Sequence, residues 1–405
     1  MDNKHNLNTL RERECILFST ADWDAPYWTN KQHTARLLSQ KGWRVLYVES
    51  VGLRTPNLAS GRDLKRLAHR FLRGVGSLLL GPRQVEKKLW IFSPLAIPKA
   101  HDQSLIRSFN QGVLRWVISR FMKKEHISQP LIWTYHPFIL EAIKDLRHGP
   151  LIYHCVDDLS TIPGVDGSAV QREERKLLSR CSIVFTTSEP LKNRCKIINS
   201  NTFFFPNVVD LEHFGKAQDQ ETIPEILKKI PEPRLVYHGL LSDYKVDFQL
   251  LLDVARNHPE WQLIFIGEER EGQSNPLVQE LKSLPNVHFL GYLNYESLPD
   301  YLRGMSVGLL PTQINDYTRF MFPMKYFEYL AAGLPVVSTP LEFTRSCDAG
   351  LISAAGSLEF IAAIKKQLQR GRLTREESVR FVGPHTWKAR MDQMLQIIES
   401  VIKSE

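Results

Sequence analysis

Short apolar runs rich in β-branched and aromatic residues alternate with amphipathic stretches along most of the chain. Runs of roughly four to eight such residues are typical of strands that are buried on both faces. The stretches between them show helical spacing, and 29–42 ends in lysine and glycine, which is a common helix stop. Strands that alternate with helices predict parallel βαβ units, and therefore an α/β fold.

The alternation falls into two series. The predicted strands are 15–20, 43–50, 89–94, 130–135, 151–156, 182–188 and 202–206 in the first series, and 234–239, 261–268, 286–292, 305–311 and 334–340 in the second. The interval 207–233 is polar and contains three prolines, which predicts an interdomain linker. A chain of 405 residues is also long enough for two domains.

We therefore expect two doubly wound, Rossmann-like domains that face each other across a cleft. The first domain spans 1–206 and the second 234–384, and the last helix, 385–405, is expected to pack back on the first domain. Ligands of such sheets bind beyond the carboxyl ends of the strands.

Composition narrows the class of protein. The five cysteines are scattered and never form a CxxC pair, so we expect neither a disulfide nor a metal role for them. No apolar run reaches the roughly 18 residues of a membrane span, and charges in the first twenty residues argue against a secretory signal. A cytoplasmic location is the resulting expectation. The net charge of +8 favours phosphate-bearing partners, but the nucleic-acid motifs are missing, so nucleic acid is not expected as a partner.

The segment 322–340, FPMKYFEYLAAGLPVVSTP, is the most informative part of the sequence. Pro323 and Lys325 introduce a short helix that carries Glu328, and a glycine-proline break precedes a buried strand. A helix N-terminus attracts anions, and a carboxylate accepts hydrogen bonds from hydroxyl groups. The segment therefore predicts a site for a nucleotide-linked ligand.

Four stretches together carry a family resemblance. They are WTNKQHTARLLSQKGWRVLYVE, IYHCVDDLS with EERKLLSRCSIVFTTSEPLKNR, FPNVVDLEHF, and the series from VYHGLLSDYKVD to 322–340. In order and spacing they resemble the group-1 glycosyltransferases of the GT-B superfamily, in particular bacterial enzymes of surface-polysaccharide assembly such as the teichuronic-acid type. The resemblance implies a nucleoside-diphosphate-sugar donor in the second domain and a glycan or lipid-linked glycan acceptor in the first. It implies neither a cofactor nor a metal.

The resemblance also assigns donor-binding residues. Glu328 matches the second glutamate of the family's Glu-x7-Glu motif and is expected to hold the donor ribose, with Lys325 on the diphosphate. Gly239 ends a strand where a side chain would block a phosphate or the domain partner, although a glycine is also common at such a turn. Lys245 matches a basic residue of the family's diphosphate clamp, whereas the other basic position of that clamp is Leu240.

Two positions depart from the pattern or lie at its margin. The first glutamate of the Glu-x7-Glu motif falls at Phe320, so the acid is absent, and Arg319 or Asp316 is the candidate to occupy similar space. Tyr292, after the strand 286–292, lies where the family's base-binding loop would be, and either stacks on a base or packs at the edge of the core.

Two candidate catalytic residues lie in the first half. His136 follows a strand and is either an acceptor-side base or a structural histidine. Asp157 and Asp158 follow the next strand, and neighbouring strand positions point in opposite directions. Asp157 is therefore the candidate base that deprotonates an acceptor hydroxyl, and the other acid is expected to cap the following segment.

The segment 62–74, RDLKRLAHRFLRG, has apolar residues at helical spacing with basic residues between them. Such a helix either lies on an anionic membrane surface, peripherally, or packs on the first domain. The basic stretch 115–124 is a candidate for the same face.

Two alternatives to a glycosyltransferase remain open. One is a nucleotide-sugar epimerase or phosphorylase on the same fold, although the arginine cluster of a phosphorylase is not seen. The other is a catalytically weak nucleotide- or glycan-binding partner in polysaccharide assembly, which the changes at Phe320 and Leu240 favour.

Overall fold

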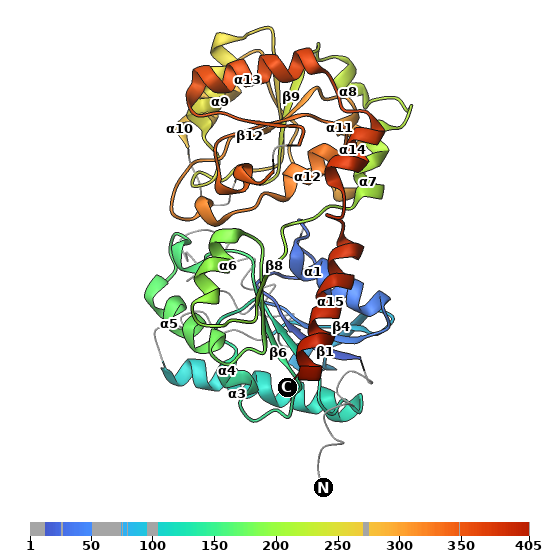
Figure 1. Ribbon diagram of the computed structural model, residues 1–405, viewed down its shortest axis with the longest axis vertical. Helices are drawn as coiled ribbons and strands as arrows, with labels where there is room; N and C mark the ends of the chain where they lie inside the picture. The colour runs from blue at the N-terminus through green and yellow to red at the C-terminus, as the bar shows by residue number, and fades with distance from the viewer. Residues whose placement is uncertain are drawn as a thin grey trace. The chain divides into compact units, whose positions relative to one another are not determined.

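The computed structural model describes residues 13–25, 27–50, 74, 76–78, 80–94, 104–269, 275–347 and 349–404 (Figure 1). It divides into two compact units. The first consists of Met1–Phe205 together with Met391–Glu405, and the second of Pro206–Arg390. Each unit is built on a predominantly parallel sheet with helices packed against it, so the predicted α/β fold of two Rossmann-like domains is confirmed.

The first unit contains an eight-stranded sheet in the order β3-β4-β2-β1-β5-β6-β7-β8. Its elements are β1 (Glu14–Phe18), α1 (Asn30–Gln40), β2 (Arg44–Val48), β3 (Arg83–Glu86), β4 (Leu89–Phe92), α3 (Ser104–Lys124), β5 (Leu131–Thr134), α4 (Leu140–Ile143), β6 (Leu151–Cys155), η2 (Leu159–Thr161), α5 (Gly167–Leu178), β7 (Ile183–Thr186), α6 (Glu189–Lys196) and β8 (Thr202–Phe204). All neighbouring strands are parallel except β3 and β4. Every residue of the central strands β1, β5 and β6 is buried, which explains why these strands read as continuous apolar runs.

The last helix, α15 (Trp387–Ser404), packs on the first unit (Figure 1). Met391, Met394 and Ile398 are buried in the same cluster as Leu17 of β1. They recur at helical spacing, so one face of α15 meets the sheet. Lys41 pairs with Asp392 at the edge of this contact.

The second unit contains a six-stranded parallel sheet in the order β11-β10-β9-β12-β13-β14. Its elements are α7 (Leu211–Gly215), η3 (Lys216–Gln218), α8 (Glu225–Lys228), β9 (Arg234–His238), α9 (Phe248–Asn257), β10 (Gln262–Ile266), α10 (Pro276–Lys282), β11 (Val287–Phe289), η4 (Tyr295–Ser297), α11 (Leu298–Arg303), β12 (Val307–Leu310), η5 (Thr318–Phe320), α12 (Met324–Ala331), β13 (Val336–Ser338), η6 (Glu342–Arg345), β14 (Leu351–Ser353), α13 (Gly356–Arg370) and α14 (Arg375–Val382).

This sheet is covered on both faces, as a doubly wound fold requires. Along β9, Leu235 and Tyr237 belong to one core cluster and Val236 to another. The first cluster includes residues of α9, α10 and α13, and the second includes residues of α7, α11, α12 and α14. Successive strand residues point to opposite faces, so the two clusters are the two sides of one sheet.

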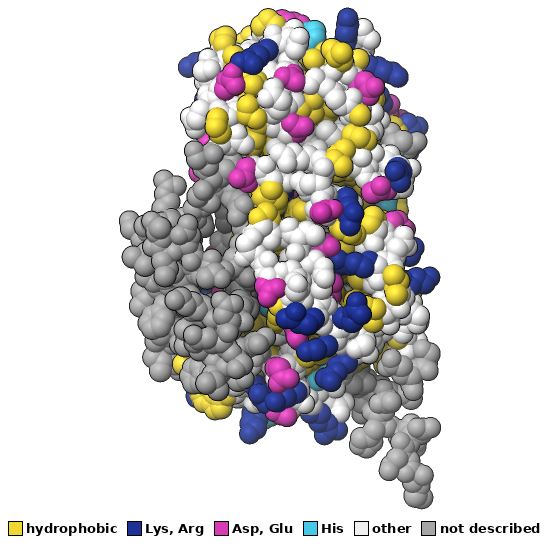
Figure 2. Space-filling model, turned by 90° about the vertical axis from the view of Figure 1, so that its left-hand side faces the viewer, with side chains coloured by type: hydrophobic (Ala, Val, Ile, Leu, Met, Phe, Trp, Pro, Cys, Tyr) yellow, Lys and Arg dark blue, Asp and Glu magenta, His cyan; other side chains and the backbone are white. Residues whose placement is uncertain are grey.

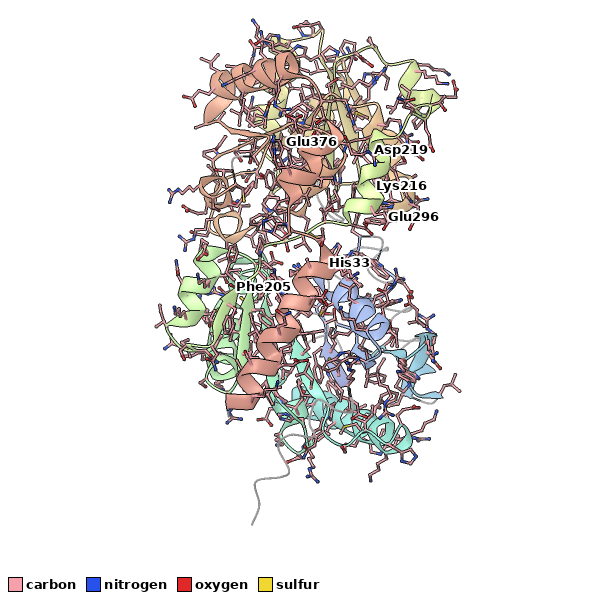
Figure 3. All side chains as sticks on the ribbon, turned by 45° about the vertical axis from the view of Figure 1, so that its right-hand side comes forward. His33, Phe205, Lys216, Asp219, Glu296 and Glu376 are labelled. Atoms are coloured by element: carbon pink, nitrogen blue, oxygen red, sulfur yellow. The ribbon has the colours of Figure 1, made fainter. Side chains whose placement is uncertain are left out.

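The structure differs from the sequence-based expectation at 207–233. Instead of a linker, this segment forms α7, η3 and α8 and is part of the second unit. Val209, Phe214 and Leu227 are buried in its core. Figure 3 shows Lys216 and Asp219 beside the helix that carries Glu376, and Asp219 pairs with Arg375 of that helix. Pro224 precedes α8, in which Leu227 faces inward whereas Ile226 is 48% exposed.

Candidate functional site

The strand order of the second sheet reverses between β9 and β12. From β9 the chain proceeds to β10 and β11 on one side, and β12, β13 and β14 then extend the other side. Ligands of doubly wound sheets bind beyond the carboxyl ends of the strands at such a reversal. β9 ends at His238 and is followed directly by Gly239, so these residues lie at the strand reversal.

Gly239 lies against the side chain of Lys325, on the first turn of α12. A Cβ atom at position 239 would be 2.6 Å from Lys325 Cε and 2.8 Å from its Nζ. Gly239 also has a φ of +114°, which favours glycine. Gly267, at the end of β10, is equally confined, because its Cβ would be 2.0 Å from the carbonyl oxygen of Gly239. The absence of a side chain at Gly239 allows the Lys325 side chain to pack against the end of β9. The absence of one at Gly267 allows the ends of β9 and β10 to approach each other.

Glu328 lies one turn further along α12, beside His238. The distance from Glu328 Oε2 to His238 Nε2 is 3.3 Å, and the side chains are 12% and 7% exposed. Burial lowers the pKa of His238 well below its usual value, and nearby Lys325 lowers it further. Burial raises the pKa of Glu328 to about 7, although Lys325 opposes this change. The site therefore holds a neutral imidazole next to a carboxyl group that titrates near neutral pH.

α12 is fixed to the sheet by Tyr329, which is fully buried. The backbone N–H of His238 donates to Tyr329 Oη at 3.1 Å, and this hydroxyl donates to the carbonyl of Val236 at 3.2 Å. The ring also fills the space above Gly308 of β12, where a Cβ atom would approach it to 2.5 Å. Glu328, the residue before Tyr329, is thus held in register with the end of β9.

Lys245 is the second cation at the strand reversal. Its Nζ lies 5.5 Å from the ring centre of Tyr244 and 4.8 Å from that of Tyr317. Burial lowers the pKa of Lys325, Glu328 opposes the change, and the charge of Lys245 lowers it further. Within the described part of the chain, neither lysine forms an ion pair with a carboxylate. Two ammonium groups that disfavour each other are the complement of a multiply charged anion.

The remaining donor-side candidates lie further out. Tyr292 follows β11, two strands away from β9, and is 39% exposed. Arg319 is in η5, where it pairs with Asp316 at 3.5 Å and stacks over Phe320 at 4.7 Å. Phe320 itself is only 8% exposed. The position of the missing family glutamate is therefore occupied by a ring that packs inward.

In the first unit, the two adjacent aspartates have different environments. Asp158 is buried, accepts from the backbone N–H of Ser160 at 3.0 Å and caps η2. Its other oxygen pairs with Arg194 at 2.6 Å, and Arg194 also pairs with Glu174 at 3.1 Å. Asp157 is partly exposed after the carboxyl end of β6. The capping role that we expected for one of the two acids is that of Asp158.

His136 follows β5, next to the reversal between β1 and β5 in the first sheet. It is 3% exposed, and its Nδ1 accepts the backbone N–H of Phe138 at 3.1 Å. The hydroxyl of Thr134 accepts from the N–H of His136 and donates to its carbonyl, both at 2.9 Å. These contacts favour the structural alternative, in which His136 shapes the turn after β5.

Sequence reasoning missed three polar residues at the strand reversal of the second sheet, which are His238, Gln313 and Asn315. His238 had a signal, because it precedes the glycine in the motif YHG. Gln313 and Asn315 had none, since their partners lie 67 to 71 residues away in the sequence.

Residues 62–73 lie outside the described residues, so the predicted amphipathic helix has no structural description. Among the residues that are described, no helix is long and apolar enough to cross a membrane. The same residues include no group of three or more His, Cys, Asp or Glu side chains arranged to hold a metal ion.

Solved structures share the fold of the two units over nearly the whole chain. Sucrose-phosphate synthase from Thermosynechococcus elongatus has a TM-score of 0.71 at 15% identity, covering 97% of this chain and 100% of that one. HepE from Anabaena, in complex with UDP, has a TM-score of 0.63 at 16% identity, covering 96% and 100%. An E. coli trehalose-6-phosphate protein bound to UDP-2-fluoro glucose also has a TM-score of 0.63, at 12% identity, covering 96% and 99%. The chain therefore has the GT-B fold.

The sequence comparisons find similarity over part of the chain. Residues 232–370 match the family described as glycosyl transferases group 1. TuaH of Bacillus subtilis (strain 168), a candidate teichuronic acid biosynthesis glycosyltransferase, is 30% identical over 158 residues. That match covers 38% of this chain and 40% of TuaH. The residues that resemble this family lie in the unit that contains Lys325 and Glu328.

Proposed function

We propose that the protein transfers a sugar from a nucleoside-diphosphate sugar, held by the second unit, to a hydroxyl group of a glycan or lipid-linked glycan bound by the first. One observation carries the proposal: Lys245, Lys325 and Glu328 gather at the strand reversal, where Gly239 leaves room for the side chain of Lys325. The solved relatives whose structures contain UDP or a UDP sugar support the same class of donor.

Each group has a role in this transfer. The two ammonium groups balance the charge of the diphosphate as it leaves, which is how a transferase can act without a bound metal. The Glu328 carboxylate accepts hydrogen bonds from the ribose hydroxyls. Asp157 takes the proton of the acceptor hydroxyl, and the oxygen of that hydroxyl forms a bond to the anomeric carbon of the donor sugar. The bond from that carbon to the diphosphate breaks, and its electrons leave with the diphosphate.

A panel of UDP-, GDP- and dTDP-sugars tests the proposal. Thermal unfolding with each sugar identifies the donor, because a ligand that binds only the folded protein raises the unfolding temperature. The Glu328→Gln variant should lose most of that increase. Release of the nucleoside diphosphate is then measured with and without membrane extract and in the presence of EDTA. Binding without any release would favour the catalytically weak partner, and no binding by any sugar would overturn the proposal.

We also propose that the acceptor side of the protein contacts an anionic membrane surface. The two units differ in charge: the first has 32 Lys and Arg against 21 Asp and Glu, whereas the second has 20 against 23. Figure 2 shows Lys and Arg side chains gathered over the first unit on one side of the molecule. On α3, Trp116 is 53% exposed, with Arg120 over its ring at 5.6 Å and Lys123 and Lys124 exposed one turn further on. An exposed tryptophan among cations suits the headgroup region.

A further inference from the structure

Two loops meet at the strand reversal of the second unit. The first is the turn 239–247 after β9, which carries Lys245, and the second is the segment 311–318 after β12. Gln313 Nε2 donates to the carbonyls of Asp243 and Val246 at 3.0 and 3.1 Å. Asn315 Nδ2 donates to the carbonyl of Tyr244 at 2.8 Å, and the backbone N–H of Gln313 donates to that of Lys245 at 2.8 Å. Four consecutive carbonyls around Lys245 are thus bound by two residues of the other loop.

The segment that makes these bonds is itself held firmly. Asn315 Oδ1 accepts from the backbone N–H groups of Tyr317 and Thr318, each at 3.0 Å. Thr318 is fully buried, and its hydroxyl accepts from the N–H of Asn315 at 3.0 Å and donates to the carbonyl of Gln313. The hydroxyl of Thr339, just after β13, donates to the carbonyl of Thr312 at 2.7 Å. The hydrogen bond from Thr339 therefore connects the end of β13 to the segment 311–318, and this segment in turn binds the turn that carries Lys245.

This arrangement has a consequence for the ammonium group. A lysine side chain has four rotatable bonds and loses considerable rotational freedom when it is fixed on a ligand. Here the backbone on both sides of Lys245 is fixed by hydrogen bonds from Gln313 and Asn315. The Lys245 ammonium lies near the rings of Tyr244, on the same turn, and Tyr317, on the other loop. The two rings meet edge to face at 5.4 Å. The two rings and the bound backbone therefore position the Lys245 ammonium group without a bound anion.

We infer that Gln313 and Asn315 are positioning residues, which hold Lys245 where it binds the diphosphate of the donor. The inference rests on the proposed function, because it assigns the anion to the same site. It extends that site to two residues that contribute no charge and that act through the backbone of the opposite loop.

The test is the affinity for UDP, measured by calorimetry, in Gln313→Met and in Asn315→Ser. Methionine keeps the length of glutamine without its donor, and serine can keep an acceptor for the local turn but cannot reach Tyr244. Each variant should weaken UDP binding by about five- to tenfold, the effect of one or two lost hydrogen bonds. In a Lys245→Met background the same changes should have less than about a twofold effect, because two residues that act through one group are not additive.

Gln218→Met is the matched control. Gln218 Nε2 also joins two distant segments, by donating to the carbonyl of Ala331 at 2.9 Å, but it is not part of the two loops. UDP affinity should stay within about twofold of the wild type in this variant. An undiminished effect of Gln313→Met in the Lys245→Met background, or an equal effect of Gln218→Met, would show a merely structural role and overturn the inference. If the inference is overturned in this way but the wild-type protein binds UDP, the proposed function still stands. A wild-type protein that binds no nucleoside diphosphate overturns the proposed function itself.

Discussion

The two units share a fold but use charge in opposite ways. The first unit carries a net charge of +11 and the second −3, which together give the +8 of the chain. Yet it is the second, acidic unit that gathers two lysines at its strand reversal. In the first unit, Arg194 and Arg44 are engaged with buried carboxylates, whereas Arg120, Lys123 and Lys124 lie on the surface of α3.

The comparison shows that net charge does not locate an anion site. A specific site needs a few cations that converge, as Lys325 beside Gly239 and Lys245, whose charge lowers the pKa of Lys325, do. A dispersed basic surface instead attracts extended anionic partners without fixing their position. The basic excess of the sequence thus belongs to the unit that we assign to the acceptor, and the proposed nucleotide site is independent of it.

The largest expected effect separates the roles of the units. Asp157→Asn should lower the rate of sugar transfer by about 10²- to 10⁴-fold, because the acceptor hydroxyl loses its base. Donor affinity should stay unchanged, since the second unit is intact. Steady-state kinetics and calorimetry on the same preparation measure both quantities. Asp158→Asn is the contrasting variant: it should lower the unfolding temperature, because Arg194 loses a buried partner. A normal rate in Asp157→Asn would remove Asp157 from the mechanism.

The next effect concerns the cations of the second unit. Lys325→Met should weaken binding of the nucleotide sugar that the panel identifies by about 10- to 100-fold, which is the range for a hydrogen bond to a charged group. Lys228→Met removes the same charge from an exposed ion pair on α8 and should change the affinity by less than twofold. Calorimetry of the two variants at one salt concentration gives the comparison. Equal losses in both would mean that the unit binds the donor by its overall field.

The sequence predicted the strands well and the site only in part. The strands predicted from apolar runs all exist, because a strand buried on both faces has to be apolar throughout. The two strands that were missed, β3 and β14, lie at sheet edges and are partly exposed, so the pattern of β3 is polar. Lys325 and Glu328 stood out because they share one helix. Lys245 lies near Lys325, and Gln313 and Asn315 form hydrogen bonds with the turn that carries Lys245. These contacts join segments that are distant in the sequence, so no local sequence pattern predicts them.

A smaller effect is expected from pH. The pKa of Glu328 is raised to about 7 by burial, so its carboxylate, the form that accepts from ribose hydroxyls, becomes populated as the pH rises through neutrality. The nucleotide sugar that the panel identifies should therefore bind up to about tenfold more tightly at pH 8 than at pH 6. Its diphosphate has no proton that titrates in this range, and the pKa of His238 lies well below it. Glu328→Gln should abolish the dependence, and an unchanged slope in that variant would assign it to another group.

The smallest effect tests the basic surface of the first unit. Arg120→Gln should weaken binding to vesicles that contain phosphatidylglycerol by about fivefold, because one cation near an anionic surface contributes about 1 kcal/mol. Arg380→Gln is its counterpart in the second unit, since Arg380 is also exposed and stacks over an aromatic neighbour on its helix, the partly buried Phe381, at 5.1 Å. That variant should bind vesicles like the wild type. Sedimentation with vesicles at low and at high salt measures both, and the difference between the variants should shrink as salt screens the surface. Equal behaviour of the two variants at low salt would mean that α3 does not face the lipid.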